Sequence, residues 1–292
     1  MVEQLLAFVL LLIGVRSPSD LPVVLGEGTQ QSTRSSQFGS LSQTASPTIA
    51  TQIPTENEYI ELRKKHDLLE EQRTLASEVY TSKTQKLKTL ISDYASSGTT
   101  RRYSNAQLNS AITEENNAFM TLIQFGTSQV SVAGKMHMSD MAPLLSKFTD
   151  PDRVKKTYAI QSNIVSLMEK RSLTMAAQSM KMLEIIGIAI QQVEEYPKRR
   201  NTREFYQAVQ HAIDRIAEAK NDLIFLSAKR NFIQLTSKAA LKNDVQKVWA
   251  DTEESLEYTY RTLQRAQYSV STVIQLQAYA REEPVPAKTK TH

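Results

Sequence analysis

Glycine and proline are scarce in this chain, with 8 and 9 residues respectively among 292. Neither occurs anywhere between Lys198 and Glu283. Because β and α/β proteins need both residues at frequent turns, this scarcity excludes a fold made of many short elements. The sequence therefore predicts an all-α protein built from a few very long helices.

Cysteine is absent altogether, which excludes disulfides, thiolate metal sites and a cysteine nucleophile. The four histidines are scattered, and no two have the i, i+4 spacing of a metal site on a helix. The sequence also contains no glycine-rich phosphate loop, dinucleotide fingerprint or nucleophile elbow. We therefore predict that the chain is not an enzyme and that it takes no cofactor, metal ion or small-molecule substrate.

Three pairs of adjacent carboxylates occur in the predicted helices. Neighbouring side chains on a helix point about 100° apart, so two such carboxylates do not converge on one substrate atom. We interpret all three pairs as solvated surface: Glu70–Glu71, Glu114–Glu115 and Glu194–Glu195.

Positive charge exceeds negative charge only slightly, with a formal net charge of +4 and a pI of about 9.0. This excess is compatible with an anionic partner but is too small to indicate nucleic acid. Hydrophobic residues make up 40% of the chain, which is enough for a core, and its nine methionines suit irregular gaps between helices.

Residues 1–16 form an apolar amino-terminal segment, in which the run from Leu5 to Val15 is uninterrupted. The run is too short to cross a bilayer, which takes ~20 residues, but it has the length of the apolar part of a secretory signal. Glu3 stands where a signal carries positive charge, and Pro18 follows the expected cleavage site. The segment is therefore either signal-like or the remnant of a preceding region.

Composition divides the rest of the chain into three parts. Residues 17–55 are rich in Ser, Thr and Gln and have almost no apolar periodicity, so they are predicted to form a disordered linker. Residues 56–283 are predicted to form a long-helix bundle, and residues 284–292 a disordered tail. At the start of the bundle, Thr55 followed by Glu58 has the pattern of a capping box.

Apolar periodicity predicts where the helices of the bundle begin and end. The expected helices run from Glu56 to Ser97, from Ser104 or Asn105 past Pro143, from Pro151 toward Tyr196, and from Thr202 to Glu283. Pro143 and Pro197 each mark either a kink or an end. The apolar face of the first helix is expected to contain Leu62, His66, Leu69, Ala76, Tyr80, Leu87, Leu90 and Tyr94.

The stretch from residue 202 to 283 would span ~120 Å as one straight helix. The chain therefore either folds back near residues 228–243 or forms an elongated bundle that pairs with a second chain. Its carboxyl-terminal half has a heptad seam made of Leu241, Val245, Val248, Thr252, Leu256, Tyr260, Leu263, Ala266, Val270 and Val273. Together these patterns predict an elongated bundle of three to four long, kinked helices.

Basic residues gather in three clusters, which are the candidate binding residues. They are Lys198, Arg199, Arg200 and Arg203; Arg101 and Arg102; and Lys83, Lys86 and Lys88. Each Lys or Arg close to an anionic bilayer contributes ~1 kcal/mol to binding. Each cluster alone is compatible with ordinary solvated surface, so the clusters form a binding face only if the fold brings them to one side.

Several stretches resemble the helical part of sorting-nexin-type BAR domains. They are Phe125-Gly126-Thr127-Ser128, residues 183–223 with their basic break, and the stretch from Val245 to Tyr279. The resemblance implies an antiparallel dimer of long helices that binds curved, anionic membrane. It also implies phosphoinositide or phosphatidylserine as the lipid, a copy of itself or a related helical chain as partner, and a cytoplasmic, peripheral position on endosomal membranes.

Two other functions remain open from the sequence. The chain is alternatively a coiled-coil scaffold that binds only other proteins. It is also compatible with an exported helical subunit of a surface or secretion apparatus, placed in the cell envelope or outside the cell, if the Leu5–Val15 run acts as a signal.

Overall fold

The computed structural model describes residues 55–96, 104–145, 151–196, 202–228 and 241–281. These residues form five α-helices: α3 (Glu56–Ser96), α4 (Asn105–Leu145), α5 (Pro151–Glu195), α6 (Thr202–Ser227) and α7 (Leu241–Arg281). Four of the five have 41 to 45 residues, which corresponds to about 60 Å or more of helix. The prediction of an all-α bundle of long helices is confirmed for the described part of the chain.

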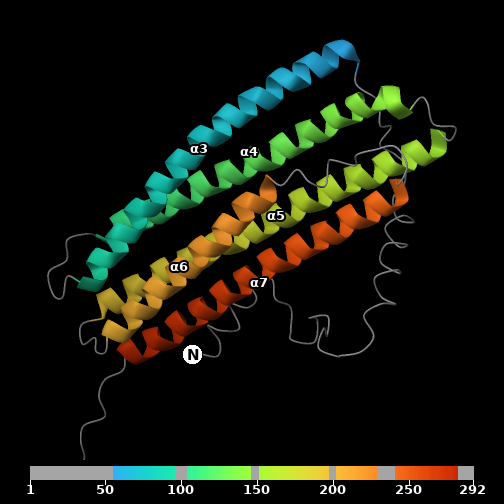
Figure 1. The fold of residues 1–292 in the computed structure, drawn as a ribbon. Coiled ribbons are helices and arrows are strands. Elements are labelled where there is room, and N and C mark those ends of the chain that lie inside the picture. The colour runs from blue at the N-terminus through green and yellow to red at the C-terminus, as the bar shows by residue number, and fades with distance from the viewer. Residues whose placement is uncertain (1–54, 97–103, 146–150, 197–201, 229–240, 282–292) are drawn as a thin grey trace, which may run out of the picture.

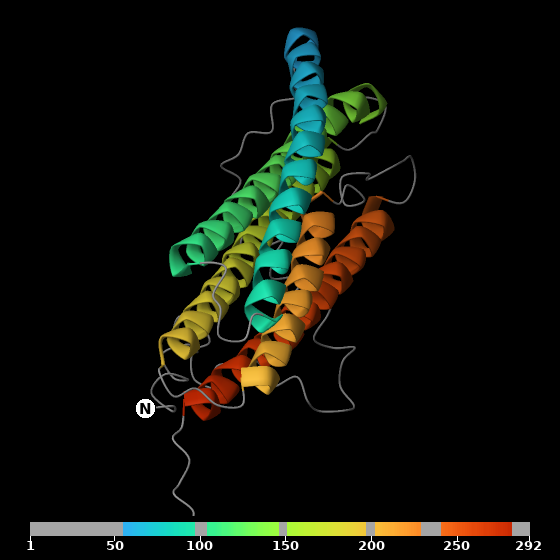
Figure 2. The same cartoon turned by 90° about the vertical axis from the view of Figure 1, so that its left-hand side faces the viewer.

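The helices lie side by side in an elongated bundle, and consecutive helices run in opposite directions (Figures 1 and 2). α3 packs closely on α4, and α7 packs on α5 and α6. The short helix α6 packs against all four other described helices, so it occupies the centre of the bundle. Its apolar side chains, such as Phe205, Val209 and Leu223, are completely buried.

Most predicted helix boundaries agree with the structure. The capping box at the start of α3 is confirmed: the backbone N–H of Thr55 donates to Glu58 Oε2 at 2.7 Å, and the N–H of Glu58 donates to Thr55 Oγ1 at 3.4 Å. The N–H and the hydroxyl of Thr55 both donate to the Glu58 carboxylate and so lower the pKa of Glu58. A similar pair of bonds joins Ser104 and Gln107 at the start of α4. α4 continues past Pro143, so this proline does not end the helix.

The number of helices differs from the predicted three to four, because residues 202–281 form two helices. α6 and α7 pack against each other and run in opposite directions (Figure 1). The chain thus folds back, which was one of the two alternatives. Four predictions concern parts of the chain that the structure does not describe. They are the apolar segment 1–16, the linker 17–55 except Thr55, the tail 284–292 and the kink or end at Pro197.

The predicted apolar faces are largely buried. On α3, Leu69, Ala76, Tyr80, Leu87, Leu90 and Tyr94 belong to the core. On α7, Leu263, Ala266, Val270 and Val273 are buried, and Thr252 is the buried polar member of the seam. Tyr260 was wrongly assigned to this seam: it is 41% exposed, and its neighbour Thr259 is buried.

The middle of α5 is buried on most sides, although Ile188 is exposed and the side chains of Lys181 and Glu184 are partly exposed. The segment Asn163–Glu195 is long and apolar enough to cross a membrane by length and composition. Half of its most apolar window is buried inside the bundle, and the core helix of a soluble protein has the same character.

Gly126 marks a close approach between helices. A Cβ at this position would lie 2.6 Å from Ser227 Oγ and 3.3 Å from the Ser227 carbonyl carbon, so α4 and α6 touch here through their backbones. A Cβ at Gly134 would make only an ordinary contact of 3.9 Å with Val165.

Candidate functional site

The three basic clusters have different positions in the fold. Lys83, Lys86 and Lys88 lie on the carboxyl-terminal half of α3, and Arg203 is exposed in the first turn of α6. The other members lie outside the described residues: Arg101, Arg102, Lys198, Arg199 and Arg200.

The lysines of α3 are engaged in ion pairs across the bundle. Glu114 Oε2 on α4 accepts hydrogen bonds from Lys83 at 2.8 Å and Lys86 at 3.2 Å. Lys88 donates to Asp214 on α6 at 3.0 Å. The two lysines lower the pKa of Glu114 to about 2, mainly through their hydrogen bonds. Much of the positive charge of this cluster is therefore neutralised locally.

The other two clusters flank helix ends that meet. α3 ends and α4 begins at the same end of the bundle at which α5 ends and α6 begins (Figure 1). At this end Asn105 Nδ2 donates to Glu195 Oε1 at 3.0 Å, and the Tyr206 hydroxyl donates to Glu194. We call this the basic end: the bundle end bounded by Ser96, Asn105, Glu195 and Thr202. Residues 97–103 and 197–201, which contain Arg101, Arg102 and Lys198–Arg200, join these helix ends along the chain and lie outside the described residues.

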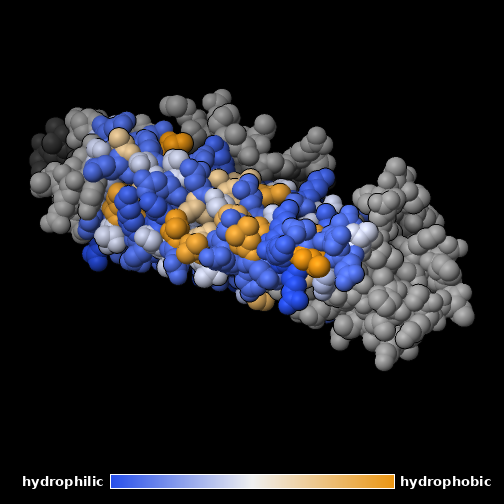
Figure 3. All heavy atoms as spheres, turned by 90° about the horizontal axis from the view of Figure 1, so that it is seen from above, coloured by the Kyte–Doolittle hydropathy of each residue, from blue (hydrophilic) through white to orange (hydrophobic). Residues whose placement is uncertain are grey.

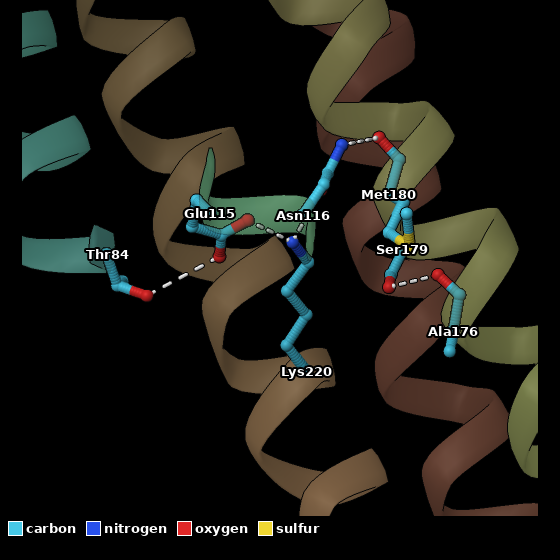
Figure 4. Close-up of polar contacts among 7 residues, drawn as sticks. All are labelled: Thr84, Glu115, Asn116, Ala176, Ser179, Met180 and Lys220. Atoms are coloured by element: carbon cyan, nitrogen blue, oxygen red, sulfur yellow. Dashed lines mark hydrogen bonds and ion pairs between the residues drawn. The ribbon is translucent and has the colours of Figure 1, made fainter. Parts of the chain in front are cut away.

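A buried charge cluster that the sequence analysis missed lies in the interior of the bundle (Figure 4). Lys220 Nζ on α6 donates to Glu115 Oε2 on α4 at 2.5 Å and to Asn116 Oδ1 at 3.0 Å. The side chains of Lys220 and Glu115 are 0% and 4% exposed. The other carboxylate oxygen of Glu115 accepts from Thr84 on α3 at 3.4 Å, so the cluster joins three helices.

Glu115 was predicted to be solvated surface, and this prediction is wrong. The signal was present in the helical register: Glu115 lies between Ile112 and Phe119, at steps of three and four residues, in the buried seam of α4. Lys220 occupies the corresponding position between Ile216 and Leu223 on α6. A carboxylate and an ammonium at seam positions of two helices predict a buried pair, since neither group is buried alone.

Aromatic rings complete the surroundings of the pair. Lys220 Nζ lies 4.7 Å from the centroid of Phe119, which is a cation–π distance. The ring of Tyr80 packs on Phe119, and burial followed by the charge of Glu115 raises the pKa of Tyr80 well above its usual value. Burial lowers the pKa of Lys220, and the charge of Glu115 opposes that shift. The cluster is closed to solvent and joins α3, α4 and α6.

A broad groove with a volume of about 620 Å³ lies where α3 meets α4 and α6. Its walls are mostly hydroxyl-bearing and charged residues of α3, with an apolar floor: Arg73, Thr74, Ser77, Glu78, Thr81, Ser82, Leu122 and Ile224. The groove is open to solvent rather than enclosed, unlike a typical small-molecule site. Within the described helices, no group of three or more His, Cys, Asp or Glu side chains is close enough to hold a metal ion.

Exposed apolar side chains occur on several helices of the described surface. The face in Figure 3 is mostly hydrophilic, with separate apolar areas. Large apolar side chains that are about half exposed include Ile60, Leu68, Leu75 and Val79 on α3. Four tyrosines of α7 are also exposed.

No family model matches this sequence, and no curated protein or solved structure matches it either. The resemblance to sorting-nexin-type BAR domains therefore stays a prediction from the sequence.

Proposed function

We propose that this chain is a non-enzymatic helical module that binds anionic, curved membrane with its basic end. The observation that supports this is the hydrogen bond between Asn105 and Glu195, because it joins the helix ends that flank two of the three basic clusters. The basic residues proposed to contact the membrane precede or follow these helix ends in the sequence: Arg101, Arg102, Lys198, Arg199, Arg200 and Arg203.

The binding free energy expected from these residues is suited to reversible binding. At ~1 kcal/mol for each basic residue near an anionic bilayer, six residues contribute at most ~6 kcal/mol. Glu194, Glu195 and Glu204 lie at the same helix ends and reduce the positive excess. We therefore expect binding to be weak for a single chain and to weaken further as salt is raised, because salt screens charge attraction at a membrane surface.

The lysines of α3 contribute less in this proposal. Lys83 and Lys86 form ion pairs with Glu114, and Lys88 forms one with Asp214. A lipid headgroup therefore competes with these carboxylates for the three lysines. The lipids proposed are phosphatidylserine or phosphoinositides on the cytoplasmic, endosomal side, as the resemblance to BAR domains implies.

Self-association is the second part of the proposal. Two linked basic ends bind a membrane more tightly than one, because the second contact forms at high effective concentration. An antiparallel homodimer of this chain, or a pair with a related helical chain, therefore converts weak contacts into stable attachment.

Co-sedimentation of the purified chain with vesicles tests the lipid-binding part. We expect binding to vesicles that contain phosphatidylserine, little binding to vesicles of phosphatidylcholine alone, and loss of binding as salt is raised. Equal binding to both kinds of vesicle, or none to either, contradicts the proposal.

A further inference from the structure

α7 has a second heptad stripe on the side that faces away from its buried seam. The stripe recurs at steps of three and four residues and consists of Tyr258, Arg261, Arg265, Tyr268, Thr272, Gln275 and Tyr279. None of these side chains is buried, and the three tyrosines are 59%, 77% and 61% exposed. A repeat of this kind is the pattern with which one helix packs along another.

The chemistry of the stripe is that of a protein interface rather than of ordinary solvated surface. Tyrosine and arginine are the residue types enriched at interface hot spots, because their flat groups bury large areas and still form polar contacts. α7 packs on α5 and α6 through its other side, so this stripe remains on the outside of the bundle.

We propose that the outer side of α7 around Glu254, Tyr258, Arg261 and Arg265 binds the same side of α7 on a second copy of this chain, with the two helices antiparallel. In one antiparallel register, Tyr258 lies opposite Arg261 of the second copy, and Glu254 lies opposite Arg265 of the second copy. Glu254 and Arg265 are both exposed. Because the pairing is symmetric, each contact occurs twice, giving two ion pairs and two cation–π contacts.

Charge distinguishes this arrangement from a parallel one. In a parallel, in-register pair, Arg261 and Arg265 would each face their own copy, which is unfavourable. The centre of the antiparallel register lies between Thr259 and Tyr260, close to the middle of α7. The two helices therefore overlap over almost their whole length of about 60 Å.

The existing partner of Arg261 is compatible with this contact. Arg261 donates to Glu257 on its own helix at 2.5 Å, and both side chains are more than half exposed. A guanidinium has five donors and a flat face, so it keeps this ion pair while it stacks on a tyrosine.

This inference rests on the self-association in the proposed function and gives it a surface, but it does not depend on lipid binding. Failure of vesicle binding leaves it intact, and failure of the α7 contact leaves the basic end intact. The two ideas are therefore separated by measuring molar mass without lipid and vesicle binding on the same variants.

Charge reversal with measurement of molar mass by light scattering is the first test. We expect the wild-type chain to be a dimer, E254K and R265E to be monomers, and an equimolar mixture of these two variants to recover the dimer, because each new charge then meets its opposite. R171E reverses an exposed charge on α5 and should leave the dimer unchanged. A monomeric wild-type chain, or dimers of both single variants, overturns the proposal.

Cross-linking tests the direction of the helices, and the absence of natural cysteine makes it specific. In the proposed register, positions 258 of the two copies lie about 4.5 Å apart along the axis, and positions 279 lie about 58 Å apart. A short bis-maleimide should therefore link Y258C into dimers and should not link Y279C. Efficient linking of Y279C, or no linking of Y258C, overturns the antiparallel pairing.

Discussion

Lys220 and Glu115 form an ion pair in the interior of the bundle, with Nζ 2.5 Å from Oε2 and almost no solvent exposure at either side chain. The pair joins α6 to α4, and Thr84 extends it to α3. Only one alignment of α4 and α6 brings the two charges together, so the pair favours this register over slipped alternatives, in which each charge would be buried alone.

Removal of Lys220 tests the energetic importance of this pair. The variant K220M keeps the volume of the side chain but leaves the Glu115 carboxylate buried without its charged partner. We expect the free energy of unfolding to fall by about 3–5 kcal/mol, measured by urea denaturation.

The double variant E115L/K220M is the matched control. Replacing both charges by apolar groups removes the unpaired carboxylate, so the double variant should regain most of the stability that K220M loses. If K220M and E115L/K220M were equally unstable, the loss would come from packing rather than from the uncompensated charge.

Two glycines of α4 should respond in opposite ways to substitution by alanine. G126A places a Cβ against Ser227, whose backbone cannot move away easily, so we expect a loss of about 1–3 kcal/mol. G134A meets only Val165 at contact distance, so the better helix propensity of alanine should stabilise the chain by up to about 1 kcal/mol. Urea denaturation of both variants measures the difference.

The close contact at Gly126 also predicts a partial rescue. S227A removes the oxygen that lies 2.6 Å from the new Cβ, so G126A/S227A should be more stable than G126A. Equal stability of these two variants would mean that Ser227 is not the obstacle.

Acid should weaken the attachment of α3 to α4 through Glu114. Its pKa is lowered from 4.5 to about 2 in the folded chain, so its carboxylate contributes stability that is fully present above about pH 4.5 and is lost as pH falls through about 2. We expect E114Q and K83A/K86A to lose less stability than the wild type between about pH 5 and about pH 2. Parallel pH profiles for all three chains would contradict this assignment.

Long-range contacts limited what the sequence could predict. The scarcity of glycine and proline was sufficient to predict long helices, and the Thr55–Glu58 pattern located the start of α3, because both signals are local. The burial of Glu115 depends on Lys220, which is more than one hundred residues away. Two adjacent glutamates, Glu114 and Glu115, are typical of a solvated helix surface. Predicting the burial of Glu115 would have required placing it on the buried face of α4 from its spacing to Ile112 and Phe119.

The basic clusters show the same limit. From the sequence alone, Lys83, Lys86 and Lys88 could not be distinguished from the other basic residues as candidates for membrane binding. Their carboxylate partners on α4 and α6 are distant in the chain. Packing of α3 on these helices provides those partners. It also brings together Asn105 and Glu195, which no local pattern predicts.

Vesicle binding of two charge-removal variants tests the central claim most directly. One variant replaces Lys198, Arg199, Arg200 and Arg203 at the basic end with alanine, and the other replaces Lys83, Lys86 and Lys88 on the side of α3. Co-sedimentation with phosphatidylserine vesicles should fall at least tenfold for the first and change little for the second, because about four contributions of ~1 kcal/mol are lost only at the basic end. An equal loss in both variants, or full binding by the first, would contradict the account.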